Sequence, residues 1–221
     1  MRVSSTRAAG LLLLLTAVAT AVSVMTRLAG SDEPLEGAAI QLPVILDTGQ
    51  YVISGAARTI SGFALVAAAA FLRVAIRPGQ PMLAGTAATL LELSGAATAI
   101  SGASMLALAG FLPQSTEGVA SLVAWDAPGW IGAVDGARSI TGKLGFMLAG
   151  LGLMVLGPVQ WRMGGLLRVF AVADVVIGVA MVLIWVDAAT VMHRVSGIAF
   201  LIWLIVSGVW LTVGLLRPAR R

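Results

Sequence analysis

The chain has 221 residues, of which 59% are hydrophobic and 11% are charged, and its net charge is +4. Soluble domains carry roughly 45–50% apolar and about 25% charged residues, so a soluble fold has no way to cover this much apolar surface. The basic residues stand at the ends of apolar stretches rather than in one patch with interleaved aromatic side chains, which excludes a nucleic-acid-binding protein.

Six stretches are apolar enough to cross a bilayer, since a spanning helix needs about 20 predominantly apolar residues. Helix is the only suitable element, because an open sheet would leave backbone groups unpaired in lipid. The sequence therefore predicts an all-α, single-domain, polytopic transmembrane bundle. In chain order, the predicted spans are 10–28, 52–76, 82–112, 139–159, 166–186 and 195–216.

The first span also resembles a signal peptide, because a basic segment precedes its apolar run and small residues follow it. The triplets 17–19 and 19–21 have the small residues that a cleavage site needs. The apolar run is long for a signal peptide, so we expect residues 1–25 to be retained, and cleavage stays open as the alternative.

Charges between the spans set the predicted orientation. With the N-terminus in the cytoplasm, the inner segments carry most of the arginines and no carboxylate, whereas every carboxylate outside the spans lies on the outer side. Both termini are then cytoplasmic, and the long segments 29–51 and 113–138 are outer loops, with a short surface helix at 116–125. Lys143 is the only lysine, and such arginine-rich usage fits a bacterial genome of high GC content. We therefore expect a multi-pass protein of a bacterial cytoplasmic membrane.

Small residues form stripes along three predicted helices, and in lipid such stripes let helix backbones approach closely. We expect these stripes to face the interior of the bundle. They comprise Ser54, Gly55, Arg58, Ser61, Gly62 and Ala69 in the second span, Gly85, Thr89, Glu92, Ala96, Ala99 and Ala103 in the third, and Thr141, Gly142, Gly145, Ala149 and Gly152 in the fourth.

An internal echo links two of these spans. Residues 55–62 (GAARTISG) resemble residues 135–142 (DGARSITG), and both segments open a helix that runs inward from the outer side. A partial third copy, 97–102 (ATAISG), lies in the third span. A repeat of helical hairpins, as in many transporters, is one interpretation; chance recurrence in a glycine- and alanine-rich chain is the other.

Two carboxylates, Glu92 and Asp174, fall inside spans, where a charge costs at least about 2.5 kcal/mol and therefore marks a candidate functional residue. The alternative is a structural role, for Glu92 as a neutral acid or as the ion-pair partner of Arg58 or Lys143. Arg58 and Arg138 occupy matching places in the two echoed segments. They are the other candidates, either for binding an anion across the bundle or as ordinary arginines at helix ends.

The predicted substrate-binding set is therefore Arg58, Glu92, Arg138 and Asp174. Further polar residues near the outer ends of the spans form a predicted outer vestibule, or else a plain belt of charged helix ends. They are Asp47, Asp135, Lys143, Asp187, His193 and Arg194.

Chemistry that needs particular residue types is limited in this chain. There are no cysteines, and His193 is the only histidine, so one chain can form no disulfide, no cysteine-ligated metal site and no haem held by two histidines. The sequence also lacks the phosphate-binding, zinc-protease and serine-hydrolase motifs. We expect no metal and no cofactor, and an enzyme is the least favoured class.

The segment 90–95 (LLELSG) and the segment 193–211 (HRVSGIAFLIWLIVSGVWL) are similar to parts of an uncharacterised bacterial family of six-helix membrane proteins. The layout of helices and outer loops resembles that family over most of the chain. The resemblance implies an architecture and carries no activity.

Two classes of function remain. The first is transport or binding of a small solute through a polar site open to the outer face. The second is a non-catalytic subunit that packs against another membrane protein or against further copies of itself.

Overall fold

The computed structural model describes residues 2–29, 48–76, 81–111, 129–165, 167–185 and 190–213. Nearly all of these residues are helical. The helices are α1 (Arg2–Ala29), α3 (Thr48–Ile76), α4 (Pro81–Phe111), α6 (Gly129–Met163), α7 (Leu167–Val182) with the 3₁₀ turn η1 (Leu183–Trp185), and α8 (Thr190–Val213).

Each of the six long helices is long and apolar enough to cross a membrane, so the predicted all-α bundle of six spans is confirmed. Two boundaries differ clearly: α1 begins at Arg2 rather than at Gly10, and α6 begins at Gly129 rather than at Ser139. The residues added to it include Asp135 and Arg138, which form an ion pair three residues apart on the helix. Such a pair stabilises a helix beyond its apolar part, where hydropathy alone predicts a loop. The surface helix predicted at 116–125 lies outside the described residues.

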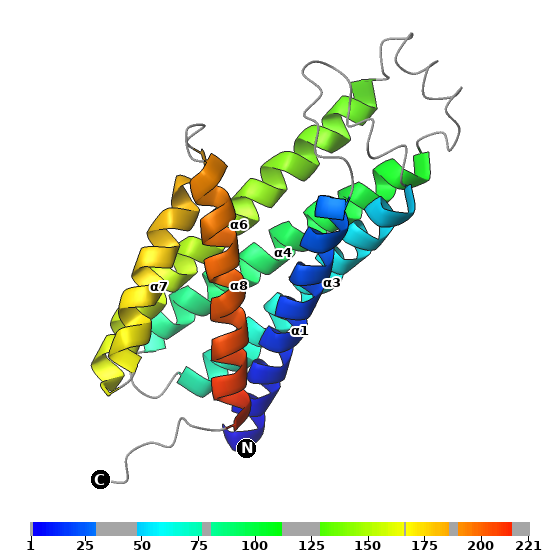
Figure 1. The fold of residues 1–221 in the computed structure, drawn as a ribbon. Coiled ribbons are helices and arrows are strands. Elements are labelled where there is room, and N and C mark those ends of the chain that lie inside the picture. The colour runs from blue at the N-terminus through cyan, green and yellow to red at the C-terminus, as the bar shows by residue number, and fades with distance from the viewer. Residues whose placement is uncertain are drawn as a thin grey trace.

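Successive helices run in opposite directions, so that α1 begins and α8 ends at the same end of the bundle (Figure 1). Arg7, Arg73, Arg162 and Arg168 belong to the helix turns nearest this end, which we call the basic end. It is the end that the charge pattern predicts to be cytoplasmic.

The central helix of the bundle is α4, which packs between α3 and α6. On one side α1 packs against α3 and α8, and on the other side α7 packs against α6. Contact between α7 and α8 is slight, and Figure 1 shows these two helices separating toward the basic end. We call the diverging, basic-end part of this helix pair the wedge between α7 and α8.

Glycines allow the closest helix contacts. A Cβ atom on Gly62 of α3 would lie 2.5 Å from the carbonyl oxygen of Gly95 in α4, and one on Gly178 of α7 would lie 2.5 Å from that of Gly150 in α6. Because lipid tails are as apolar as leucine, such backbone approach replaces the hydrophobic effect as the main source of helix association. The small-residue stripe predicted for the second span is buried as expected, apart from Arg58, which is half-buried.

The stripe predicted for the third span is wrong for all its members except Ala99, which is buried against Gly62 of α3. Thr89, Ala96 and Ala103 are exposed on the surface of α4, and Glu92 is half-buried. The buried residues of α4 lie on two other faces because α3 and α6 pack on either side of it, and examples are Ala88, Leu91, Ser94 and Ser101. A helix held between two neighbours uses small residues on both faces, so the sequence offers more than one candidate stripe.

The three echoed segments meet in the half of the bundle away from the basic end. Gly102 of α4 packs against the backbone of Gly55 and Thr59 in α3, while Ser101 of α4 donates a hydrogen bond to the carbonyl of Arg138 in α6. Small residues recur where three helices cross, which gives a packing reason for the echo alongside duplication.

The first helix is part of the packed core. Ala9, Leu13 and Ala17 are buried in it, and the hydroxyls of Thr20 and Ser23 lie 2.8 and 3.0 Å from those of Ser61 and Ser54 in α3. Hydroxyl pairs of this kind join helices in lipid, where no water competes for the bonds. Residues 2–29 thus behave as a spanning helix in this structure, and their retention in the cell stays a prediction.

Candidate functional site

The structure does not bring the four predicted binding residues together in one site. Glu92 lies on the surface of α3 and α4, Arg58 and Arg138 lie where α3, α4 and α6 meet, and Asp174 lies on α7 facing α8. Three separate polar locations therefore have to be considered.

The ion-pair partner of Glu92 is Arg73, rather than Arg58 or Lys143 as predicted. The Nη2 atom of Arg73 lies 2.6 Å from Oε2 of Glu92, and it also donates a hydrogen bond to the hydroxyl of Thr89. Helical side chains lean toward the N-terminus of their own helix. Because α3 and α4 are antiparallel, Arg73 leans away from the basic end and Glu92 leans toward it, so the two charges meet. Their side chains are 41% and 27% exposed, so this pair lies at the edge of the bundle.

Arg58 and Arg138 both lie near Ser101 of α4. The guanidinium of Arg58 occupies space beside Gly142 of α6, where a Cβ atom would come within 2.7 Å of its Nη2. Arg138 is 8% exposed, and its Nε donates a hydrogen bond of 2.7 Å to Asp135. The matching arginines of the echo therefore do come to one region, and Arg138 is bound by protein groups there.

The predicted outer vestibule is described only in part. Asp47, Asp187 and the side chain of His193 lie outside the described residues. Arg194 is exposed, and the amine of Lys143 lies 5.5 Å from the centre of the Trp185 ring. Asp135 forms an ion pair with Arg138 of the same helix. The described members are spread over α6 and α8 and do not by themselves form a binding site.

Asp174 is fully buried, as a carboxylate inside a membrane span seldom is without a function. It shares a buried face of α7 with Ala171 and Gly178, and the close approach of Gly178 to Gly150 holds this part of α7 against α6. The indole Nε1 of Trp203 in α8 donates a hydrogen bond of 2.6 Å to its Oδ1 atom. Asp174 therefore joins α7 to α8 where they otherwise contact each other little.

A cavity of about 60 Å³ lies beside this contact, in the wedge between α7 and α8. Its volume is enough for a few water molecules or a very small solute. Its lining comes from the basic-end halves of five helices, and it comprises Leu13, Leu72, Leu156, Gln160, Met163, Leu167, Phe170, Trp203, Ser207, Trp210 and Leu211. The cavity thus lies in the basic-end half of the bundle, whereas the sequence predicts a polar site open to the outer face.

Buried polar atoms around this cavity lack protein partners within the described part of the chain. They are Oδ2 of Asp174, Oε1 of Gln160 and Nε1 of Trp210. Gln160 and Trp210 line the cavity, and Gln160 also lies close to the Asp174 carboxylate. Because nearly all buried polar atoms in proteins are hydrogen-bonded, three such atoms in one place point to water or a ligand. We call Gln160, Asp174, Trp203 and Trp210 the Asp174 cluster.

Of the Asp174 cluster, only Asp174 is predicted from the sequence. Trp203 and Trp210 are seven residues apart, which places them on one face of α8. The ring of Trp210 packs edge-on against Phe170 of α7 at 5.0 Å between ring centres. Tryptophans are usual at the membrane interface. Trp203 lies ten residues before the end of α8 at Val213, and this position inside the span is the one sequence feature that sets it apart.

These helices and their apolar surfaces define the chain as a multi-pass α-helical membrane protein. In comparisons with known proteins, no family model, no curated protein and no solved structure matches this chain. The likeness to an uncharacterised six-helix family stays a prediction. No group of three potential metal-binding side chains occurs among the described residues.

Proposed function

We propose that this protein binds a small hydrogen-bonding solute at the Asp174 cluster, as a transport or permeation module of the bacterial cytoplasmic membrane. The observation that carries the proposal is the fully buried carboxylate of Asp174, whose Oδ1 accepts a hydrogen bond from Trp203 and whose Oδ2 has no hydrogen-bond partner among the described residues. In this proposal the basic end is the cytoplasmic end.

Energetics favour an occupant at the cluster. A polar group buried without a hydrogen bond costs roughly 1–3 kcal/mol in proteins, and a buried charge costs more. Three such groups around one cavity would be a large burden for a protein whose total stability is about 5–15 kcal/mol. A role in binding explains why these three polar groups are buried at the cavity.

The chemistry of the cluster selects the solute. Oδ2 of Asp174 and Oε1 of Gln160 accept hydrogen bonds, whereas Nε1 of Trp210 donates one. A solute that fits must be small, must carry at least two hydrogen-bond donors and must be neutral or positively charged, because a carboxylate repels anions. In this proposal the solute enters from the basic end, because the residues that line the cavity belong to the basic-end halves of their helices.

We expect Trp210→Phe to weaken solute binding about tenfold, which corresponds to about 1.4 kcal/mol, because the donor is lost while an aromatic ring remains against Phe170. Binding of urea, formamide and acetamide, which carry N–H donors together with a carbonyl acceptor for the Trp210 N–H, is measured on the purified protein by calorimetry, and native mass spectrometry shows any solute that is retained on purification.

Trp161→Phe is the matched control, because Trp161 is exposed on α6 and does not line the cavity. This variant should bind as the unmodified protein does. Equal affinity of the Trp210→Phe variant, or failure of the whole panel to bind, would contradict solute binding at the cluster.

A second candidate function, that of an assembly partner, is favoured by the pair of Arg73 and Glu92. Charged side chains that are 41% and 27% exposed on the flank of a span are costly toward lipid. Thr89 and Leu93 are exposed beside them on α4. A helix of another membrane protein that carries a hydrogen-bonding side chain would cover this face.

Single-cysteine labelling tests the assembly proposal, since the chain has no cysteine of its own. In native membranes we expect a maleimide to label Leu93→Cys at least fivefold more slowly than Ile202→Cys, although both side chains are about half exposed in the isolated chain. Detergent that removes a partner should equalise the two rates. Equal rates in the membrane would argue against a covered face.

A further inference from the structure

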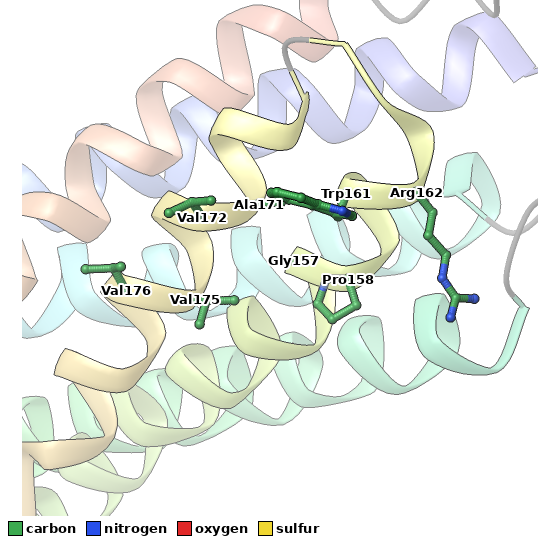
Figure 2. Close-up of a pocket in the computed structure, with 8 residues that line it drawn as sticks. All are labelled: Gly157, Pro158, Trp161, Arg162, Ala171, Val172, Val175 and Val176. Atoms are coloured by element: carbon green, nitrogen blue, oxygen red, sulfur yellow. The ribbon is translucent and has the colours of Figure 1, made fainter.

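The exposed surface of the α6–α7 hairpin has an apolar groove near the basic end (Figure 2). Gly157 and Ala171 form its floor, where a Cβ atom on Gly157 would lie 3.0 Å from the carbonyl oxygen of Ala171. Larger side chains rise on either side, and they are Pro158 and Trp161 on α6 and Val172, Val175 and Val176 on α7. A small-residue floor between large-residue walls gives a groove that runs along the helices, with a volume of about 440 Å³.

The groove ends at a positively charged group. Arg162 lines it and belongs to the last turn of α6, and Figure 2 shows its side chain extending at the end of the groove beyond Trp161. A second arginine, Arg168, stands over the ring of Trp161 at 5.8 Å from its centre. A tryptophan and two arginines at a helix end are the residues that a lipid headgroup region favours.

We propose that this groove binds one acyl chain of an anionic phospholipid, with the lipid phosphate held by Arg162. Charge complementarity supports the anionic headgroup, because basic sites between helices at the cytoplasmic side recruit negatively charged lipids. The depth of the groove in the membrane also fits an acyl chain, since the groove runs from the last turn of α6 toward the membrane interior.

Other occupants fit less well. A helix is about 10 Å across and cannot enter a groove whose floor is the contact between two packed helices. A free phosphate would use Arg162 and leave the apolar walls empty. The proposal is independent of the Asp174 cluster, because Phe170 and Asp174 lie on a different face of α7 from Val172 and Val176.

Native mass spectrometry of the detergent-purified protein tests the proposal with phosphatidylglycerol and phosphatidylcholine of equal chain length. The unmodified protein should retain phosphatidylglycerol in preference. In Arg162→Gln its affinity should fall about fivefold, the effect of one arginine near a lipid surface, while phosphatidylcholine is unaffected. Arg7→Gln, at an exposed arginine of α1, is the matched charge control and should bind as the unmodified protein does.

Filling the groove is the second arm. Val176→Trp should lower the affinity for phosphatidylglycerol by at least fivefold, and Val169→Trp should leave it unchanged, because both valines are more than half exposed and only Val176 lines the groove. Glycerol phosphate should not displace the lipid. The proposal is overturned if both lipids bind equally, if the Arg162 and Arg7 variants lose affinity equally, if Val176→Trp has no effect, or if glycerol phosphate displaces the lipid.

Discussion

Replacing Gly62 by leucine should prevent the protein from folding to a stable bundle. A Cβ atom at this position meets the backbone of Gly95 and Ala99, and backbone cannot move aside as a flexible side chain can. The helices α3 and α4 would have to separate along their length. The packing of α6 would be disturbed as well, because α6 packs against α4. We expect Gly62→Ala to cost about 1–3 kcal/mol, the range for an overpacked core, and Gly62→Leu to cost more.

Fluorescence-detected size exclusion before and after heating measures this effect. Gly85→Ala is the control, because no atom of the described residues lies within 4 Å of a Cβ at Gly85 and alanine has the higher helix propensity. Gly85→Ala should melt at the same temperature or slightly higher. If Gly62→Leu gave a monodisperse protein of unchanged melting temperature, the glycine-mediated contact of α3 and α4 would be refuted.

Two substitutions of Asp174 should separate its structural role from its binding role. In Asp174→Asn the amide oxygen still accepts the hydrogen bond from Trp203, so we expect the bundle to remain folded. Solute binding should fall at least a hundredfold, because the charge that selects a positively charged or donor-rich solute is gone. In Asp174→Leu, Trp203 loses its acceptor as well, which costs about 1–3 kcal/mol of stability in addition.

Melting temperature and calorimetric binding are recorded for both variants. The pattern expected is a folded, non-binding asparagine variant and a destabilised, non-binding leucine variant. An asparagine variant that binds as tightly as the unmodified protein would remove the Asp174 charge from the proposed function. A leucine variant that is as stable as the unmodified protein would show that the bond to Trp203 contributes nothing to the joining of α7 and α8.

The candidate site could be predicted only in outline. Hydropathy identifies Asp174 and Glu92 as exceptions within apolar segments, and that much needs no structure. The partner of Glu92 depends on the rotation and direction of two helices. Hydropathy places Arg73 at a helix end, so the sequence favours Arg58 and Lys143 as partners instead. The bond of Trp203 to Asp174 could not be predicted, because a tryptophan in an apolar span does not by itself indicate a polar contact.

Helix faces were predicted unevenly for a related reason. The stripe through Gly55 and Gly62 is buried as expected, whereas the stripe through Thr89 and Ala96 is exposed. In water, hydrophobicity distinguishes the inside of a fold from its surface. In a bilayer the surroundings are as apolar as the core, so small residues are the remaining signal, and α4 carries them on more than one face.

The number of spans and their alternating course follow from the amino-acid sequence without a structure, because the transfer of each apolar segment into a bilayer is a property of that segment alone. The charge pattern adds the predicted orientation on the same grounds. Tertiary structure decided which side chains meet: Arg73 with Glu92, Trp203 with Asp174, and a cavity at the basic end. Those contacts depend on how pairs of helices rotate and approach, and lipid that is as apolar as the helices leaves that choice to close packing and hydrogen bonds.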